Sequence, residues 1–119
     1  MDKQKINQAI DKYTLRDGKP TKWYTALYNA PAHAMERIVL SFYYATFKDD
    51  MTDAERDEYH RLRREIDLSL ENEDLAYLVR VMPEKQQEYY YKLMKLAPTG
   101  SGYVGNNAEA QEIIEQNRF

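Results

Sequence analysis

Apolar residues recur at helical spacing over residues 32–48 and cover most of the circumference of the helix that this spacing predicts. The two adjoining apolar sides carry Met35, Ile38, Val39, Leu40, Phe42, Tyr43, Thr46 and Phe47. The single polar strip carries His33, Arg37, Ser41, Tyr44 and Lys48. A helix that is apolar on most sides packs against several neighbours. We therefore predict that residues 32–48 form the central helix and that Ile38 and Phe42 lie in the core.

Narrower apolar stripes predict two helices before the central one. The first is expected over residues 2–14 and ends at the turn chemistry of residues 16–20. The second, over residues 22–29, has Thr21 as its expected N-cap and ends before Pro31. No segment shows a convincing strand pattern.

Capping signals divide the chain after the central helix. Residues 52–55, Thr-Asp-Ala-Glu, form a capping box that begins a helix running to about residue 71. The link before it is so short that this helix and the central one are predicted to form an antiparallel hairpin. Asn72 is the expected N-cap of a short helix that runs to Met82, and Pro83 begins a helix over residues 83–97.

The C-terminal part of the chain is predicted to be less tightly packed against the rest of the domain. Three of the four glycines lie in residues 98–107, which predicts a flexible linker. Residues 108–119 follow as a helical segment capped by Asn107, either docked on the domain or exchanged with a neighbouring copy. Residues 1–97 would then be the helical domain, and a chain ending at Ala97 is expected to fold. The fold class is all-α: a compact single-domain bundle of about five to seven helices around residues 32–48.

Composition limits the class of protein and the cellular compartment that we expect. Hydrophobic residues make up 43% of the 119 residues, which is enough for a packed core. The chain has no cysteine, so disulfides and thiolate metal sites are excluded. The longest apolar run, residues 38–47, is well short of the roughly 20 residues that a membrane helix needs. The polar N-terminal residues lack the apolar stretch of a signal peptide, so we expect a cytoplasmic protein.

Charge is distributed unevenly along the chain. Residues 49–74 hold eleven acids against four arginines, whereas residues 1–48 hold eight basic and four acidic residues. Evenly spaced carboxylates on a rigid helix suit a basic protein partner and accelerate its association. The predicted acidic binding surface consists of Asp49, Asp50, Asp53, Asp57, Glu58, Asp67, Glu71, Glu73 and Asp74.

A second candidate site combines cations with aromatic rings in residues 12–24. Cations that meet phosphates beside rings that stack on bases are typical of surfaces that bind nucleic acid. The residues of this alternative site are Lys12, Arg16, Lys19, Lys22, Trp23 and Tyr24.

Signals for catalysis and metal binding are weak. His33 and Glu36 are three residues apart, as are Asp57 and His60, and paired steps of this kind build metal sites in helical bundles. In the predicted hairpin the two histidines lie roughly 10 Å apart along the axis, too far for one ion. There is no nucleophile elbow and no phosphate-binding glycine loop. We expect no enzyme activity, no metal and no cofactor.

The sequence therefore favours a small non-catalytic protein-binding module. Its profile is similar, as a class only, to inhibitors carried by phages and mobile elements, such as anti-CRISPR proteins that act on host nucleic-acid enzymes. Two alternatives stay open. One is a nucleic-acid-binding protein that uses residues 12–24. The other is a small phage assembly factor that forms homo-oligomers through its C-terminal helix. No membrane partner is expected.

Overall fold

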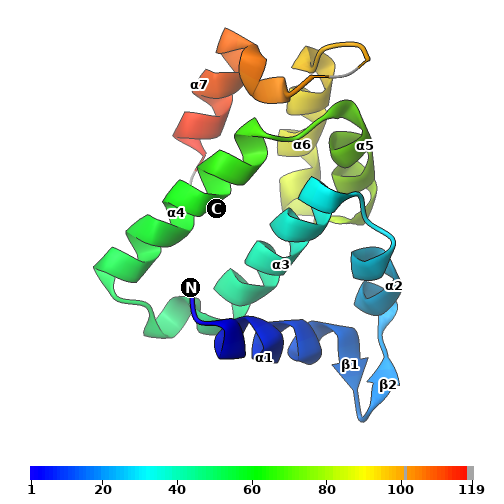
Figure 1. The fold of residues 1–119 in the computed structure, drawn as a ribbon, viewed down its shortest axis with the longest axis vertical. Coiled ribbons are helices and arrows are strands. Elements are labelled where there is room, and N and C mark those ends of the chain that lie inside the picture. The colour runs from blue at the N-terminus through cyan, green and yellow to red at the C-terminus, as the bar shows by residue number, and fades with distance from the viewer. Residues whose placement is uncertain (101, 118–119) are drawn as a thin grey trace.

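Seven α-helices follow one another in the computed structural model, which describes residues 1–100 and 102–117 (Figure 1). The helices are α1 (Lys3–Thr14), α2 (Lys22–Tyr28), α3 (Ala32–Phe47), α4 (Asp53–Leu68), α5 (Asn72–Val81), α6 (Glu84–Leu96) and α7 (Ala108–Gln116). Two single turns of 3₁₀ helix, η1 (Lys48–Asp50) and η2 (Val104–Asn106), lie before α4 and α7. The predicted all-α class is confirmed. None of these helices is both long and apolar enough to cross a membrane.

A small β-hairpin between α1 and α2 is the one strand element among the described residues, and the sequence pattern did not predict it. Strand β1 (Leu15–Arg16) pairs with β2 (Lys19–Pro20) in antiparallel register, with Arg16 opposite Lys19. The two residues between the strands have positive φ, 52° at Asp17 and 76° at Gly18. This is the backbone of a type I′ turn, for which Asp-Gly is a favoured pair. The Asp17-Gly18 pair is therefore a sequence signal for this hairpin.

The helix starts follow the caps that the sequence predicts, with one exception. Thr21 accepts a hydrogen bond from the backbone N–H of Trp23, and Asn107 accepts one from Ala110. Thr52 and Glu55 form the capping box of α4. The prediction of Asn72 as the cap of α5 is wrong. Glu71 is the N-cap, because its backbone N–H donates to the side chain of Asp74 three residues later.

Helix α3 is the centre of the fold, as predicted. It packs against α1, α2, α4 and α5, and both Ile38 and Phe42 are buried. The ring of Phe42 stacks on Tyr13 of α1 and meets Trp23 of α2 edge to face. The apolar sides of α3 therefore hold the N-terminal helices in place.

The segment after Pro98 packs against the same core. Val104, Ala110 and Ile114 are each 0% exposed and belong to the main apolar cluster. The backbone N–H of Val104 donates to the carbonyl of Leu70, and α7 contacts both α4 and α6. In this structure α7 docks on its own chain. Residues 98–107, which the sequence analysis read as a flexible linker, include the buried Val104 and the turn η2.

Gly105 shows how closely this segment approaches α4. A Cβ atom placed on Gly105 would lie 2.5 Å from the carbonyl oxygen of Leu68, which is backbone and has little freedom to move. We expect Gly105→Ala to lower the free energy of unfolding by about 1–3 kcal/mol, the usual cost of overpacking. Chemical denaturation measures this, with the exposed Asn106→Ala as a control. A Gly105→Ala protein as stable as wild type would mean that η2 does not lie against α4.

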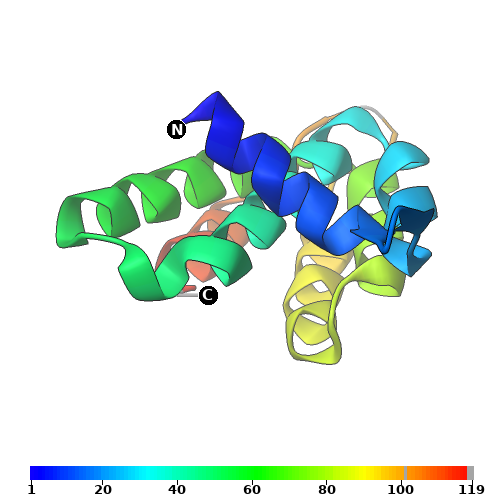
Figure 2. The same ribbon diagram turned by 90° about the horizontal axis from the view of Figure 1, so that it is seen from below.

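The two candidate sites lie on opposite sides of the molecule. Helix α1 crosses under α3, the β-hairpin projects beyond one end of α1, and η1 with the start of α4 forms the opposite side (Figures 1 and 2). The principal extents are 42 × 32 × 23 Å. The basic and the acidic candidate sites are thus far apart on one small protein.

Candidate functional site

Five of the nine predicted acidic residues form one exposed cluster, which we call the acidic corner: Asp49, Asp50, Asp53, Asp57 and Glu58. Asp49 and Asp50 lie on η1 and the other three on the first turns of α4. The same turns carry Glu55, whose carboxylate accepts the Thr52 N–H and whose pKa is lowered mainly by that bond. Lys48 and Arg56 are the cations of this stretch, and Arg56 donates to the Lys48 carbonyl. The stretch stays strongly negative.

Asp67 does not belong to this surface. Its carboxylate is fully buried and lies between Arg37 of α3 (Nε–Oδ1 3.3 Å) and Arg63 of α4 (Nη1–Oδ2 3.4 Å). Burying an isolated charge costs much free energy, and pairing it with opposite charges offsets much of that cost. The prediction that Asp67 belongs to the acidic surface is wrong, because its side chain and that of Arg63 are both fully buried.

Asp74 is also buried, and its role is to cap two helices. One carboxylate oxygen accepts the Glu71 N–H at 2.9 Å and the other accepts the Ala34 N–H at 3.1 Å. The second bond satisfies the first turn of α3, whose own N-cap is Pro31 and supplies no side-chain hydrogen bond. Glu71 is half-buried beside Gly102, and Glu73 is exposed on α5. These three acids therefore lie outside the acidic corner.

An apolar groove between α3 and α4 adjoins the acidic corner. We call this hollow of about 520 Å³ the α3–α4 groove. Its apolar lining comes from Met1, Met35, Val39, Leu40, Leu62 and Ile66, and its polar lining from His33, Glu36, Glu65 and Ser69. The Met1 ammonium lies 3.9 Å from the carboxylate of Glu58, which joins the groove to the acidic corner. Leu62 of α4 lines this groove and lies outside the main apolar cluster.

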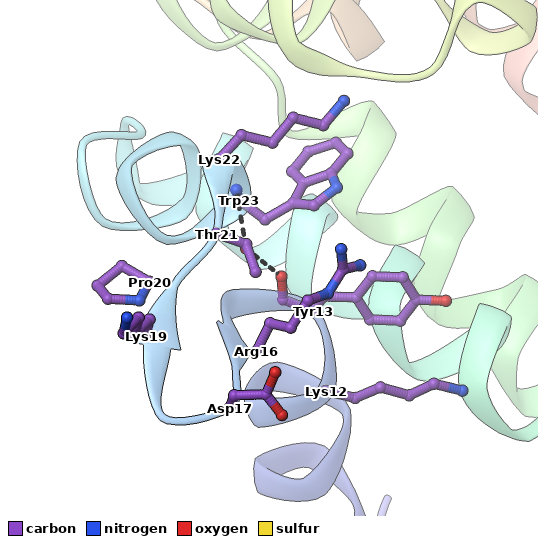
Figure 3. Close-up of a pocket in the computed structure, with 9 residues that line it drawn as sticks. All are labelled: Lys12, Tyr13, Arg16, Asp17, Lys19, Pro20, Thr21, Lys22 and Trp23. Atoms are coloured by element: carbon purple, nitrogen blue, oxygen red, sulfur yellow. Dashed lines mark hydrogen bonds between the residues drawn. The ribbon is translucent and has the colours of Figure 1, made fainter.

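The alternative nucleic-acid residues also come together, around a hollow of about 820 Å³ that we call the basic pocket (Figure 3). Its cations are Lys12, Arg16, Lys19 and Lys22, and its rings are Tyr13 and Trp23. Thr21 also lines the pocket, where it caps α2 and donates a hydrogen bond to the carbonyl of Tyr13. Asp17 supplies one opposing carboxylate from the hairpin turn. Tyr24 is not part of the lining and packs against Tyr28 instead.

A buried polar network behind these surfaces was missed from the sequence. Tyr89 and Tyr90 of α6 donate to Asp67, at 2.7 and 3.4 Å, beside the two arginines. Burial raises the pKa of both tyrosines, and the charge of Asp67 raises it further, so both rings stay neutral. Arg37 had been assigned to the polar strip of its helix, yet it is 0% exposed. The network joins α3, α4 and α6.

Arg63 extends this network to α7. Its Nη2 donates to the carbonyls of Ile114 (3.0 Å) and Asn117 (2.7 Å) at the end of that helix. A cation at a helix C-terminus satisfies carbonyls that have no partner within the helix. The C-terminal helix is therefore held by a buried charge as well as by apolar contacts.

The two histidines lie apart from one another. His33 pairs with Glu36 at 3.5 Å, and His60 lies against the rings of Tyr59 and Tyr44. Among residues 1–100 and 102–117 there is no group of three or more His, Asp or Glu side chains arranged to hold a metal ion.

No family model matches this chain. The comparisons with family models, with curated proteins and with solved structures find no match. The surfaces of the protein are therefore the guide to what it binds. One side offers an apolar groove with exposed carboxylates, and the other offers cations beside aromatic rings.

Proposed function

We propose that this protein is a non-catalytic module that binds a partner protein at the acidic corner and the α3–α4 groove. The bound segment would combine apolar side chains with Lys or Arg. The observation that carries the proposal is the continuity of the two features, since Glu58 touches Met1 of the groove and stands among the carboxylates of α4.

The two features supply different parts of binding. Burying the apolar lining gives affinity, because the desolvated centre of an interface carries most of the binding energy. The carboxylates favour the approach of a basic partner and fix its orientation. Leu62 suits the first role because it lines the groove and lies outside the main apolar cluster.

The finer form of this proposal is an inhibitor of a host nucleic-acid enzyme, of the kind that phages and mobile elements carry. Such enzymes expose Lys and Arg to meet phosphates. Exposed carboxylates on a helix would occupy the same cations. Added nucleic acid should then displace the protein from the enzyme, whereas it would leave an assembly factor bound to its own subunits.

The test is the affinity for a synthetic amphipathic peptide of leucine and lysine, measured by isothermal titration calorimetry. We expect the triple variant Asp53→Lys, Asp57→Lys, Glu58→Lys to bind at least about tenfold more weakly, a loss of about 1.4 kcal/mol or more. These side chains are exposed, so the fold should survive. Leu62→Asp should weaken binding by a similar factor. Raising the salt should weaken wild-type binding, because the Debye length is about 8 Å at physiological ionic strength.

A matched reversal on another face serves as the control. Glu84→Lys, Glu109→Lys, Glu112→Lys changes the same net charge with exposed residues of α6 and α7. It should bind the peptide nearly as well as wild type. Equal losses in both triple variants, or equal binding of a leucine–glutamate peptide, would contradict the proposal.

A further inference from the structure

Trp23 lies where three hollows meet. It lines the basic pocket, a second hollow of about 250 Å³, and a third of about 210 Å³ that adds Arg80 of α5. Tyr13 also lines the first two of these hollows. The ring of Trp23 is half-buried and is held edge to face against Phe42, with centroids 5.4 Å apart. An aromatic ring is thus fixed at the boundary between a cationic surface and an apolar hollow.

The second hollow, which we call the apolar chamber, can hold a ring but not a whole ligand. Besides Tyr13 and Trp23, its lining comes from Ile38, Ser41, Phe42, Ala45, Met82 and Pro83. Pockets that bury an entire small molecule usually measure about 300–1,000 Å³. The chamber is smaller, so the rest of a ligand whose ring entered it would extend into the basic pocket.

The cations of the basic pocket are free to meet an anion. Within the part of the chain that the structure describes, none of the four forms an ion pair with a carboxylate. Lys12 and Lys22 lie over the rings of Tyr13 and Trp23, at 5.9 and 5.8 Å from the ring centroids. Asp17 is the only acidic residue among the lining residues. The pocket therefore combines a surplus of positive charge with two aromatic faces.

We propose that the basic pocket and the apolar chamber together bind single-stranded nucleic acid. One base enters the chamber beside Trp23 and Tyr13, and the adjoining phosphates meet the four cations. A duplex keeps its bases paired and does not present one to such a chamber. Sequence-tolerant stacking beside a cationic groove is how proteins hold single strands. This site is separate from the acidic corner and the α3–α4 groove, so either proposal can fail without the other.

Trp23 itself reports on the site, because it is the chain's single tryptophan. We expect oligothymidylate to change its fluorescence in a saturable way. About 0.7 counterions are released per phosphate neutralised on a single strand, so four contacts predict a slope of about −3 for log K against log salt. Duplex DNA, inorganic phosphate and a glutamate peptide should each bind at least about tenfold more weakly than oligothymidylate.

Three sets of variants test the parts of the site. Lys19→Glu with Lys22→Glu should weaken oligothymidylate binding at least about tenfold, whereas Lys3→Glu with Lys92→Glu, which changes the same charge elsewhere, should do so far less. Asp17→Asn should tighten binding, and asparagine suits the positive φ of that position. Ala45→Leu should fill part of the chamber and weaken oligothymidylate more than phosphate. The exposed Ala76→Leu on α5 is its control.

Several results would overturn the inference. One is the absence of a saturable change in Trp23 fluorescence at low salt. Another is duplex, phosphate or glutamate peptide binding as tightly as the single strand, because each needs only the cations. Equal losses of oligothymidylate affinity in the two double lysine variants would mean that binding follows the net charge of the protein and not this pocket. If Ala45→Leu left single-strand binding unchanged, the base would not enter the chamber.

Discussion

Asp67→Asn should be among the most damaging single substitutions in this protein. The carboxylate of Asp67 is the one negative charge between two fully buried guanidiniums, and it also accepts hydrogen bonds from Tyr89 and Tyr90. Asparagine is nearly the same size but neutral, and half of its amide is a donor that would face other donors. Breaking a buried ion pair by removing one partner costs about 3–5 kcal/mol. Urea denaturation should show a loss of that size in the free energy of unfolding.

The matched control is Asp57→Asn on the same helix. Asp57 is exposed, and surface changes of this kind usually stay within about 0.5 kcal/mol. If Asp67→Asn cost no more than Asp57→Asn, the side chain of Asp67 would be in water, and the buried network described above would be wrong.

A chain that ends at Ala97 should fail to fold cooperatively. The sequence predicts the opposite, because the three glycines of residues 98–107 are typical of a flexible linker. In the structure, removing the segment takes Val104, Ala110 and Ile114 out of the core. It also leaves the buried Arg63 without the two carbonyls that accept from its Nη2. The combined loss of stability exceeds about 5 kcal/mol, which is the lower end of the range for a typical small domain.

Circular dichroism during thermal unfolding measures this result directly. The truncated chain should lack a cooperative transition, and Ile114→Ala in the full chain should keep one while losing about 2–5 kcal/mol of stability. Gln111→Ala is a suitable control because it removes an exposed side chain from the same helix. A cooperative transition near the wild-type temperature in the truncated chain would restore residues 1–97 as an independent domain.

The helices were predictable because their signals are local. Capping residues such as Thr21, Thr52 and Asn107 act within a few residues of themselves, and the spacing of apolar residues reports the buried face of each helix. The hairpin was missed because two-residue strands carry almost no periodic pattern. Its Asp-Gly turn was the only local trace.

The burial of charged residues was not predictable in the same way. Arg37, Asp67 and Asp74 lie on helices whose other charged residues face solvent, and a helical pattern does not say which charges meet a partner from another helix. Asp67 receives partners from α3, α4 and α6, and Asp74 caps a helix forty residues away. Such contacts depend on the tertiary arrangement, so a count of acids along the sequence overstated the acidic surface.

The sequence predicted most residues of the basic pocket, but it did not predict the shape of the site. Four cations and Trp23 stand close together in the sequence, so their grouping was visible. The apolar chamber beside them is completed by residues of α3 and by Met82 and Pro83. The α3–α4 groove likewise needs two helices and the N-terminal residue. Hollows between elements appear only once the elements are packed.

The most direct test of the proposed function is to map where a basic amphipathic peptide binds. Amide chemical shifts of the ¹⁵N-labelled protein would be followed while the leucine–lysine peptide is added. The proposal predicts that the largest shifts fall on Met35 and Val39 of α3 and on Glu58, Leu62 and Glu65 of α4. Shifts centred on the β-hairpin and α2, or an absence of saturable shifts along the α3–α4 groove, would contradict it.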